Sequence, residues 1–446
     1  MSAQFDPILG QMRDGVVTLA EQTAGFNRGS TAEKAAFQAS VSGDAPAGRA
    51  RLGLNKLGSN TGLLSMSGDM NSVDTSPTVY HLLASTPDNF TGFRVWYGNN
   101  TGVAVTIDAA KWALADNIAD LQNPKTGAAT STYSDTFFSA APAPTAAVIP
   151  AGSAGRPTLF ASDWVYAPSL PRSDAGTERL VCLRHVLGTT STSFPLLVQT
   201  NSAAYTNTVA GRVMFTTHAG GTNATATLSG GFGSKNVVYG IEFMTDESAV
   251  VRTMGVGDSI THNNQDTTGG CCVSWGQRAA AIAAATLGRP VTFANYGWAG
   301  QTTAQYYQRA IDLLNAGIRP DILFYSVFSP NDPISSQATV DAAFGRGMDI
   351  YQRCRVIGVK CVLTTAMPNT LLNTPNDNIR KALNNKLRAW KSRGYPVADF
   401  DLVTSTGSTP ALWKTGYNVD QYHPNATGVG AMATEAASVI AAIATS

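Results

Sequence analysis

Short apolar runs alternate with longer amphipathic segments over the C-terminal part of the chain. The apolar runs predict buried strands, and apolar residues at helical spacing predict the segments between them as helices. Regular alternation of this kind is typical of a parallel sheet covered by helices on both faces. The predicted strands are 250–256, 291–296, 322–327, 360–365 and 397–401, and the predicted helices are 275–287, 303–316, 340–357, 376–393 and 428–443.

The pattern differs between residues 61 and 248, where β-rich runs alternate with Gly, Asn, Thr, Ser and Pro. Strands without helices between them predict a β-sandwich of jelly-roll type. The runs at 92–98 and 102–108 flank a turn-like Asn-Asn-Thr and predict a hairpin, and the Ala- and Pro-rich segment 140–155 predicts a surface connection. Trp96, Tyr97 and Trp164 fit either core packing, the commoner role, or a sugar-stacking surface. Further strands are predicted at 179–185, 195–199, 211–217 and 237–243.

Residues 1–60 carry helical spacing at 7–22 and a capping-box pattern at 30–33. The chain therefore divides into a helical N-terminal segment (1–60), a β-sandwich (61–248) and an α/β domain (249–446). Residues 30–54 resemble connector segments of bacteriophage tail fibres and tailspikes, and a generic linker explains the same residues equally well.

Composition limits the function. The formal net charge of the 446 residues is +1, and the sequence has no Lys/Arg cluster. Both observations argue against electrostatic binding to nucleic acid or to an anionic membrane. No apolar stretch is long enough to predict a membrane span, and the first 15 residues do not read as a signal peptide. The five cysteines lack zinc spacing, so we expect reduced thiols, with Cys354 and Cys361 as small core residues.

Candidate chemistry lies where the predicted strands end. Ser259 follows the first strand, at the sheet edge where open α/β sheets bind ligands. A neutral serine needs a base to act as a nucleophile, and His423 is the best placed histidine, ahead of His262. Asp420, three positions before His423, can fix the imidazole as in hydrolase triads. The predicted oxyanion donors are the backbone N–H groups of Ser259 and Gly300 and the side-chain amide of Asn331.

Other polar residues in this region are not expected to take part in the catalytic steps. Asp258 is expected to bond within its own turn and Asp332 to hold its loop. Asp399 and Asp401 end the fifth predicted strand, where one of them could line the site. No His/Asp/Glu group has metal-ligand spacing, so we expect neither a metal nor another cofactor.

These residues, in this order, resemble the SGNH (GDSL) hydrolase superfamily. The resemblance covers Gly257 to His423 and implies a flavodoxin-like α/β/α sandwich and ester hydrolysis through an acyl-enzyme. One position departs from the family pattern, because Ser329 stands where the family has a glycine, two places before Asn331. The matching segments are Gly257-Asp258-Ser259, Gly300, Asn331-Asp332 and Asp420-x-x-His423.

The resemblance and the order of the three parts lead to one main expectation. We expect an esterase that removes acetyl groups from a bacterial polysaccharide, carried on a phage virion with other tail proteins, where a trimer would fit. The alternatives are hydrolysis of small or lipid esters, and a non-catalytic glycan-binding tail protein. If the chain is not of phage origin, we expect it in the cytoplasm.

Overall fold

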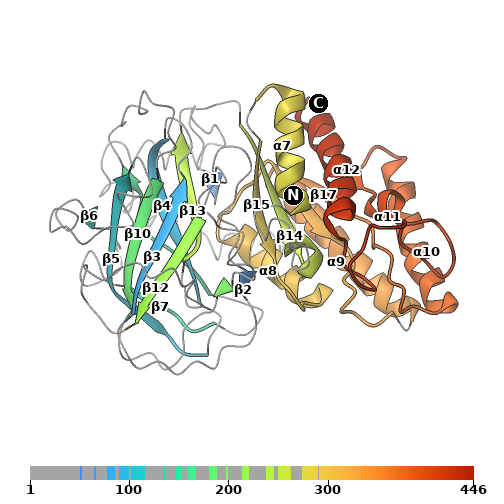
Figure 1. Ribbon diagram of the computed structural model, residues 1–446, viewed down its shortest axis with the longest axis horizontal. Coiled ribbons are helices and arrows are strands. Elements are labelled where there is room, and N and C mark those ends of the chain that lie inside the picture. Colours follow the sequence, from blue (N-terminus) through green and yellow to red (C-terminus); the bar gives the residue numbers. More distant parts are fainter. Residues whose placement is uncertain are drawn as a thin grey trace, which may run out of the picture.

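The computed structural model describes most of the C-terminal half of the chain and the strands of the N-terminal half (Figure 1). The described C-terminal residues are 250–445, apart from 263–273, 290 and 335. Apart from Arg51–Leu52, the predicted helical segment 1–60 lies outside the described residues.

The C-terminal half contains a five-stranded parallel sheet, as the sequence predicts. Its strand order, with the second strand of the chain at one edge beside the first, is the flavodoxin-like order. This order brings the carboxyl end of the first strand next to those of the second and third. From one edge to the other, the strands are β15 (Val291–Gly297), β14 (Val251–Gly257), β16 (Ile322–Ser326), β17 (Lys360–Thr364) and β18 (Val397–Ala398).

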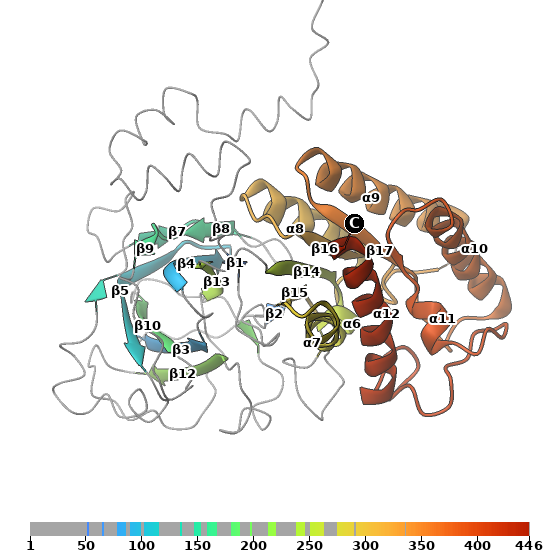
Figure 2. The same ribbon diagram turned by 90° about the horizontal axis from the view of Figure 1, so that it is seen from above.

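Helices cover both faces of this sheet (Figure 2). Two helices pack on one face together with short α11 (Phe400–Thr404), and three pack on the other. The first pair is α7 (Trp275–Leu287) and α12 (Ala426–Ala444), and the second set is α8 (Thr303–Asn315), α9 (Gln337–Val356) and α10 (Thr374–Lys391).

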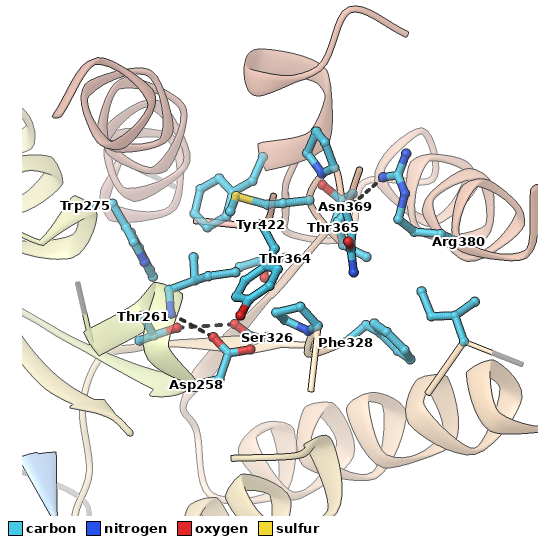
Figure 3. A pocket seen from close by; sticks show the side chains of 17 residues that line it. Asp258, Thr261, Trp275, Ser326, Phe328, Thr364, Thr365, Asn369, Arg380 and Tyr422 are labelled. Atoms are coloured by element: carbon cyan, nitrogen blue, oxygen red, sulfur yellow. Dashed lines mark hydrogen bonds between the residues drawn. The ribbon is translucent and has the colours of Figure 1, made fainter. Parts of the chain in front are cut away.

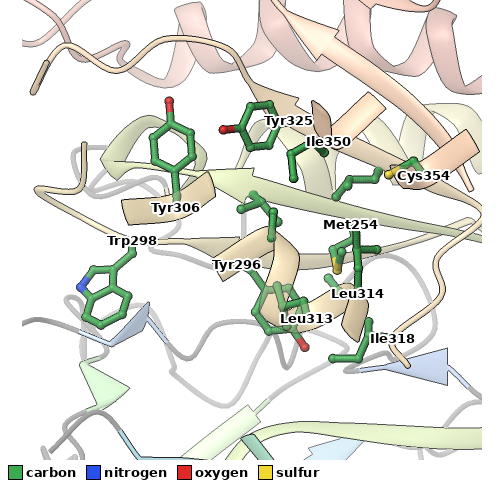
Figure 4. Packing of buried hydrophobic residues seen from close by; sticks show 14 of the residues in the cluster. Met254, Tyr296, Trp298, Tyr306, Leu313, Leu314, Ile318, Tyr325, Ile350 and Cys354 are labelled. Atoms are coloured by element: carbon green, nitrogen blue, oxygen red, sulfur yellow. The ribbon is translucent and has the colours of Figure 1, made fainter. Parts of the chain in front are cut away.

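Strand β16 shows how the sequence builds two cores at once. Successive side chains of a strand point to opposite faces, so Ile322 and Phe324 enter the core under α7 and α12 while Leu323 and Tyr325 enter the other. On the first face the ring of Trp275 meets Phe324 edge-on, with 5.4 Å between centroids. Figure 4 shows the second core.

The last strand is shorter than the sequence predicts. It ends at Ala398, and residues predicted as its continuation form helix α11. Asp399 causes the change, because its side chain accepts a hydrogen bond from the backbone N–H of Leu402, at 3.2 Å, and caps the new helix.

Helix α12 is longer than expected and, by length and composition alone, could cross a membrane. One face of the helix, including Val429, Met432 and Ile440, is buried in the core that it shares with α7. This packing explains the apolar composition of α12 as that of a core helix.

The described strands of the N-terminal half are antiparallel and pair in separate sheets. The predicted hairpin is wrong, since β4 (Phe90–Asn99) pairs with β13 and β5 (Val105–Ala115) with β10 in another sheet. Asn99 fixes this corner: its side-chain amide donates to the carbonyls of Val103 (2.8 Å) and Pro150 (2.9 Å). The other strands are β1 (Arg51–Leu52), β2 (Ser65–Met66), β3 (Thr78–Ser85), β6 (Ser134–Asp135), β7 (Ala147–Ile149), β8 (Thr158–Ala161), β9 (Val165–Tyr166), β10 (Leu180–Leu187), β11 (Leu197–Val198), β12 (Val213–Ala219) and β13 (Val238–Thr245).

Three details of this half differ from or refine the prediction. Strand β1 lies inside the segment predicted as helical, and β7 lies inside the predicted surface connection, because each pairs with a neighbouring strand. Trp96 and Tyr97 are buried, so they pack in the core. The β-sandwich as a whole stays a prediction.

Candidate active site

Ser259 lies at the carboxyl end of β14, as the first residue of the short helix α6 (Ser259–His262). Asp258 shapes the turn by accepting a hydrogen bond from the backbone N–H of Ile260, at 2.9 Å. Gly257 is required there, because a Cβ atom would lie 2.2 Å from Thr261 Oγ1. The expectation that Asp258 bonds within its own turn is confirmed.

The structure brings Ser259, His423 and Asp420 into one hydrogen-bonded chain. Ser259 Oγ lies 2.8 Å from His423 Nε2, although 164 residues separate them. His423 Nδ1 lies 2.7 Å from Asp420 Oδ2. With a carboxylate beside Nδ1, that nitrogen carries the proton and Nε2 is free to accept one from serine.

The backbone holds Asp420 in place. Its Oδ1 accepts hydrogen bonds from the N–H groups of Tyr422 (2.9 Å) and His423 (2.7 Å), so the short turn itself orients the carboxylate. Partial burial alone would raise the pKa of Asp420, but hydrogen bonds from the His423 side chain and these N–H groups outweigh it and lower that pKa from its ordinary value. Asp420 is therefore ionised at neutral pH.

The two other predicted oxyanion donors follow neighbouring strands at the same sheet edge. Gly300 follows β15 and has a φ of 75°, a backbone conformation that favours glycine. A Cβ atom at this position would meet no other atom, so a lack of space is not the reason for the glycine. The Asn331 amide nitrogen, after β16, donates to the Gln301 carbonyl at 3.0 Å and lies 3.1 Å from Ser329 Oγ. Their oxyanion role stays a prediction.

Ser329, the departure from the family pattern, is a partner of Asn331. Its hydroxyl donates to the Gln301 carbonyl at 2.9 Å and accepts from the backbone N–H of Asn331 at 3.2 Å. The serine thus ties this loop to the one that follows β15.

Arg309 is a residue that sequence reasoning misses. It lies on α8, is buried, and donates from Nη2 to the carbonyl of Gly257 at 2.7 Å. Nη1 donates to the side-chain oxygen of Gln301, whose backbone carbonyl accepts from Asn331. One side chain therefore connects the serine turn with the asparagine loop. An arginine on an amphipathic helix gives no sequence signal of this role.

His262 is enclosed in the protein. It is buried, and neither ring nitrogen has a hydrogen-bond partner among the described residues. Burial, together with the nearby charge of Arg309, lowers its pKa to about 4. A neutral, enclosed imidazole cannot replace His423 as the base.

The remaining carboxylates have structural contacts. Asp332 accepts from the backbone N–H of Thr303 at 2.8 Å and so joins its loop to the start of α8. Asp399 and Asp401 do not line the site, since both pair with Arg388, at 2.7 and 2.8 Å. Cys354 and Cys361 are buried free thiols, as expected.

A narrow cavity of about 30 Å³ lies beside the serine turn (Figure 3). Asp258 and Tyr422, the chain neighbours of Ser259 and His423, form part of its wall. Burial raises the pKa of Asp258 in this wall. The apolar side chains that line it include Phe328, Ile334 and Met367.

No group of three or more His, Cys, Asp or Glu side chains among the residues that the structure describes could hold a metal ion.

The sheet order and the Ser-His-Asp geometry define a flavodoxin-like hydrolase class for the C-terminal half. Residues 256–431 match the model of the GDSL-like Lipase/Acylhydrolase family. The match supports membership of this part of the chain in the GDSL/SGNH hydrolase family, whose function is that of an esterase or acylhydrolase. No curated protein matches the chain.

Solved structures match part of the chain at low identity. A member of the lipolytic protein G-D-S-L family from Veillonella parvula is 18% identical, with 42% of this chain and 96% of that chain covered and a TM-score of 0.33. A carbohydrate esterase family 3 protein from Talaromyces cellulolyticus is 17% identical, covering 44% and 98%, with a TM-score of 0.33. A mutant acetyl-xylooligosaccharide esterase from Geobacillus Stearmophilus is 14% identical, covering 42% and 93%, with a TM-score of 0.34.

Proposed function

We propose that this chain hydrolyses carboxylic esters through an acyl-enzyme on Ser259. The observation that carries the proposal is the hydrogen-bonded chain from Ser259 Oγ to His423 (2.8 Å) and from His423 to Asp420 (2.7 Å). His423 Nε2 takes the hydroxyl proton as Oγ attacks the ester carbonyl, and then gives it to the departing alcohol. A water molecule, deprotonated by the same nitrogen, attacks the acyl-enzyme, and His423 passes that proton to Ser259 Oγ as the bond to the acyl group breaks and the carboxylic acid leaves.

The tetrahedral intermediates of both steps carry a negative oxygen. The backbone N–H groups of Ser259 and Gly300 and the amide of Asn331 are the proposed donors. In the resting geometry the Asn331 amide bonds to Gln301 and Ser329. The Asn331 amide exchanges its contact with Ser329 for the oxyanion. This exchange is the easier one, because the Ser329 hydroxyl keeps its hydrogen bond to the Gln301 carbonyl.

The size of the cavity beside the serine turn supports a small acyl group. About 30 Å³ is room for roughly two water-sized groups, which suits an acetyl methyl better than a long chain. Its apolar wall, with Phe328 and Ile334, suits the same methyl. We therefore propose O-deacetylation in preference to lipid hydrolysis.

The natural substrate in this proposal is an acetylated bacterial surface polysaccharide, and the carrier is a phage virion. Support for the carrier comes from the likeness of residues 30–54 to phage tail connector segments, which, apart from Arg51–Leu52, lie outside the described residues. Support for the polymer comes from the small acyl cavity and from the β-rich part that precedes the hydrolase domain.

The test measures acetate released from acetylated bacterial polysaccharides and the hydrolysis of p-nitrophenyl acetate and octanoate. The proteins compared are the wild type, Ser259→Ala and, as a matched control, Ser392→Ala at the exposed end of α10. The proposal expects acetate release and a preference for the acetyl ester in the wild type and control, with both lost in Ser259→Ala. Activity that survives Ser259→Ala contradicts the mechanism, and a preference for octanoate contradicts the proposed substrate.

A further inference from the structure

A second concave surface lies at the edge of the sheet opposite Ser259. Lys360 is the first residue of β17 and Val397 the first of β18, so the groove that they line is at the amino ends of these strands. The C-terminal turns of α9 and α10 and one side of α12 complete it. Its volume is about 770 Å³, within the usual range for small-molecule and oligosaccharide sites.

Charge in this groove is unbalanced. Arg355, Lys360 and Lys391 line it together with a single carboxylate, Glu435, so three positive charges and one negative leave a net charge of +2. Lys391 is already paired with Glu435 at 2.7 Å. The exposed side chains of Arg355 and Lys360 have no ion-pair partner among the described residues. Two cations are therefore available to a ligand in a chain whose overall net charge is only +1.

A rigid aromatic surface lies in the same groove. The ring of Tyr395 is 38% exposed and packs on Trp390, with 4.1 Å between ring centroids. Tyr351 meets both rings edge-on, at 5.6 Å from Trp390 and 5.8 Å from Tyr395. Contacts with two other rings restrict the orientation of Tyr395, so its exposed part can contact a ligand at low entropic cost.

We propose that this groove binds an anionic polysaccharide through carboxylated sugar units. A pyranose ring can stack on Tyr395 while its carboxylate pairs with Arg355 or Lys360, and Arg in particular suits a planar carboxylate. The inference goes beyond the proposed esterase, because binding here does not involve Ser259. If both hold, the groove keeps a polymer on the enzyme while the distant site acts on its ester groups, which raises the effective concentration of those groups.

The test is direct binding of the full-length chain to polygalacturonate oligomers by calorimetry, with neutral dextran and single-stranded oligo-dT as comparison probes. We expect polygalacturonate alone to bind, with weaker affinity at high salt. Arg355→Gln with Lys360→Gln, and separately Tyr395→Ala, should each weaken binding by about tenfold or more.

Lys386→Gln is the matched control, since Lys386 is 46% exposed on α10 and pairs with Asp341 outside the groove. It should leave binding unchanged, and all variants should hydrolyse p-nitrophenyl acetate like the wild type, which shows that they are folded. No binding of polygalacturonate, or equal binding by all variants, would overturn the inference. Binding of oligo-dT in its place would also overturn it and would point to a nucleic-acid site. Ser259→Ala separates the two proposals, because it should abolish hydrolysis and keep this binding.

Discussion

At the scale of single residues, the proposed catalysis depends on the carboxylate of Asp420. Its Oδ2 faces His423 Nδ1 at 2.7 Å, and its other oxygen is held by backbone N–H groups. Asp420→Asn keeps the shape but places an amide against the imidazole, which favours the wrong tautomer. We expect kcat for p-nitrophenyl acetate to fall by roughly 10²- to 10⁴-fold.

The matched control for Asp420→Asn is Asp341→Asn, on the exposed side of α9 and far along the chain from the triad. Its kcat should equal that of the wild type. An Asp420→Asn enzyme with unchanged kcat would show that His423 does not need this carboxylate.

His262 gives a pH prediction at the same scale. Its pKa of about 4 in the folded protein lies below the ordinary 6.5, so between these values the unfolded chain binds a proton that the folded chain does not. Unfolding therefore becomes easier as the pH falls from 6.5 toward 4, with a cost of up to about 3 kcal/mol. Above pH 6.5 the effect is absent.

The measurement for His262 is the free energy of unfolding by urea at pH 7 and pH 4.5, in the wild type and in His262→Phe. Phenylalanine has a similar shape and does not titrate, so the variant should lose less stability on acidification. Equal losses in the two proteins would mean that His262 is not enclosed as the structure shows.

At the scale of elements, close approach of β15 and α6 positions the nucleophile. A Cβ on Gly297 would lie 2.2 Å from the backbone nitrogen of His262, and backbone atoms cannot move aside cheaply. Gly297→Ala should destabilise the protein by about 1–3 kcal/mol and lower kcat, because the displaced helix carries Ser259.

Gly345, inside α9, is the control for this prediction, since a Cβ there meets no atom within 4 Å. Gly345→Ala should leave kcat unchanged and stabilise the helix by up to about 1 kcal/mol. The measurements are thermal unfolding and kcat, compared between Gly297→Ala and Gly345→Ala. A tolerated Gly297→Ala would contradict the packing of α6 on β15.

Arg309 links α8 to both site loops, and its removal tests that link. Arg309→Met removes the 2.7 Å donor of the Gly257 carbonyl, which keeps its hydrogen bond from the Trp298 N–H at 3.1 Å, so we expect a loss of about 1 kcal/mol in stability. We expect kcat to fall more than KM rises, because the loops are displaced while the acyl cavity stays.

Arg309→Lys should recover part of the lost kcat, because a lysine can reach one acceptor but not both. Steady-state kinetics on the two variants make the comparison. A variant without arginine that keeps full kcat would show that the site loops hold their geometry without this link.

The alternation of strands and helices predicts most of the C-terminal elements to within a few residues, because periodicity reports burial directly. It fails after Ala398, where the local cap by Asp399 starts α11 and ends the strand. It fails also at Asn99, whose hydrogen bonds to Val103 and Pro150 turn the chain into another sheet. Hydrogen bonds from single side chains to the backbone leave no periodic trace in the sequence.

The site was predictable to a different degree. Ser259, His423 and Asp420 could be paired in advance, because their chemistry is specific and the strand ends converge on one edge. The role of Arg309 could not be predicted, since it depends on where the inner face of α8 meets the turn after β14. The bond between Ser329 and Asn331 also required the folded loop.

At the scale of the whole molecule, the hydrolase half contains its own sheet and cores on both faces. One of these cores continues into the N-terminal strands, since Phe93 and Tyr97 belong to the same buried cluster as Tyr296 and Trp298. Residues 249–446 expressed alone should therefore fold and hydrolyse p-nitrophenyl acetate, with a lower melting temperature than the full chain. An unfolded fragment would show that the two halves form one cooperative unit.

The central claim is that Ser259 is a nucleophile activated by His423. The direct measurement is covalent labelling with diethyl p-nitrophenyl phosphate, followed by mass spectrometry of the intact chain and its peptides. The account predicts one diethylphosphoryl group on the peptide with Ser259 in the wild type, none in Ser259→Ala, and much slower labelling in His423→Ala. A label on another residue, or a wild type that hydrolyses esters without being labelled, would contradict it.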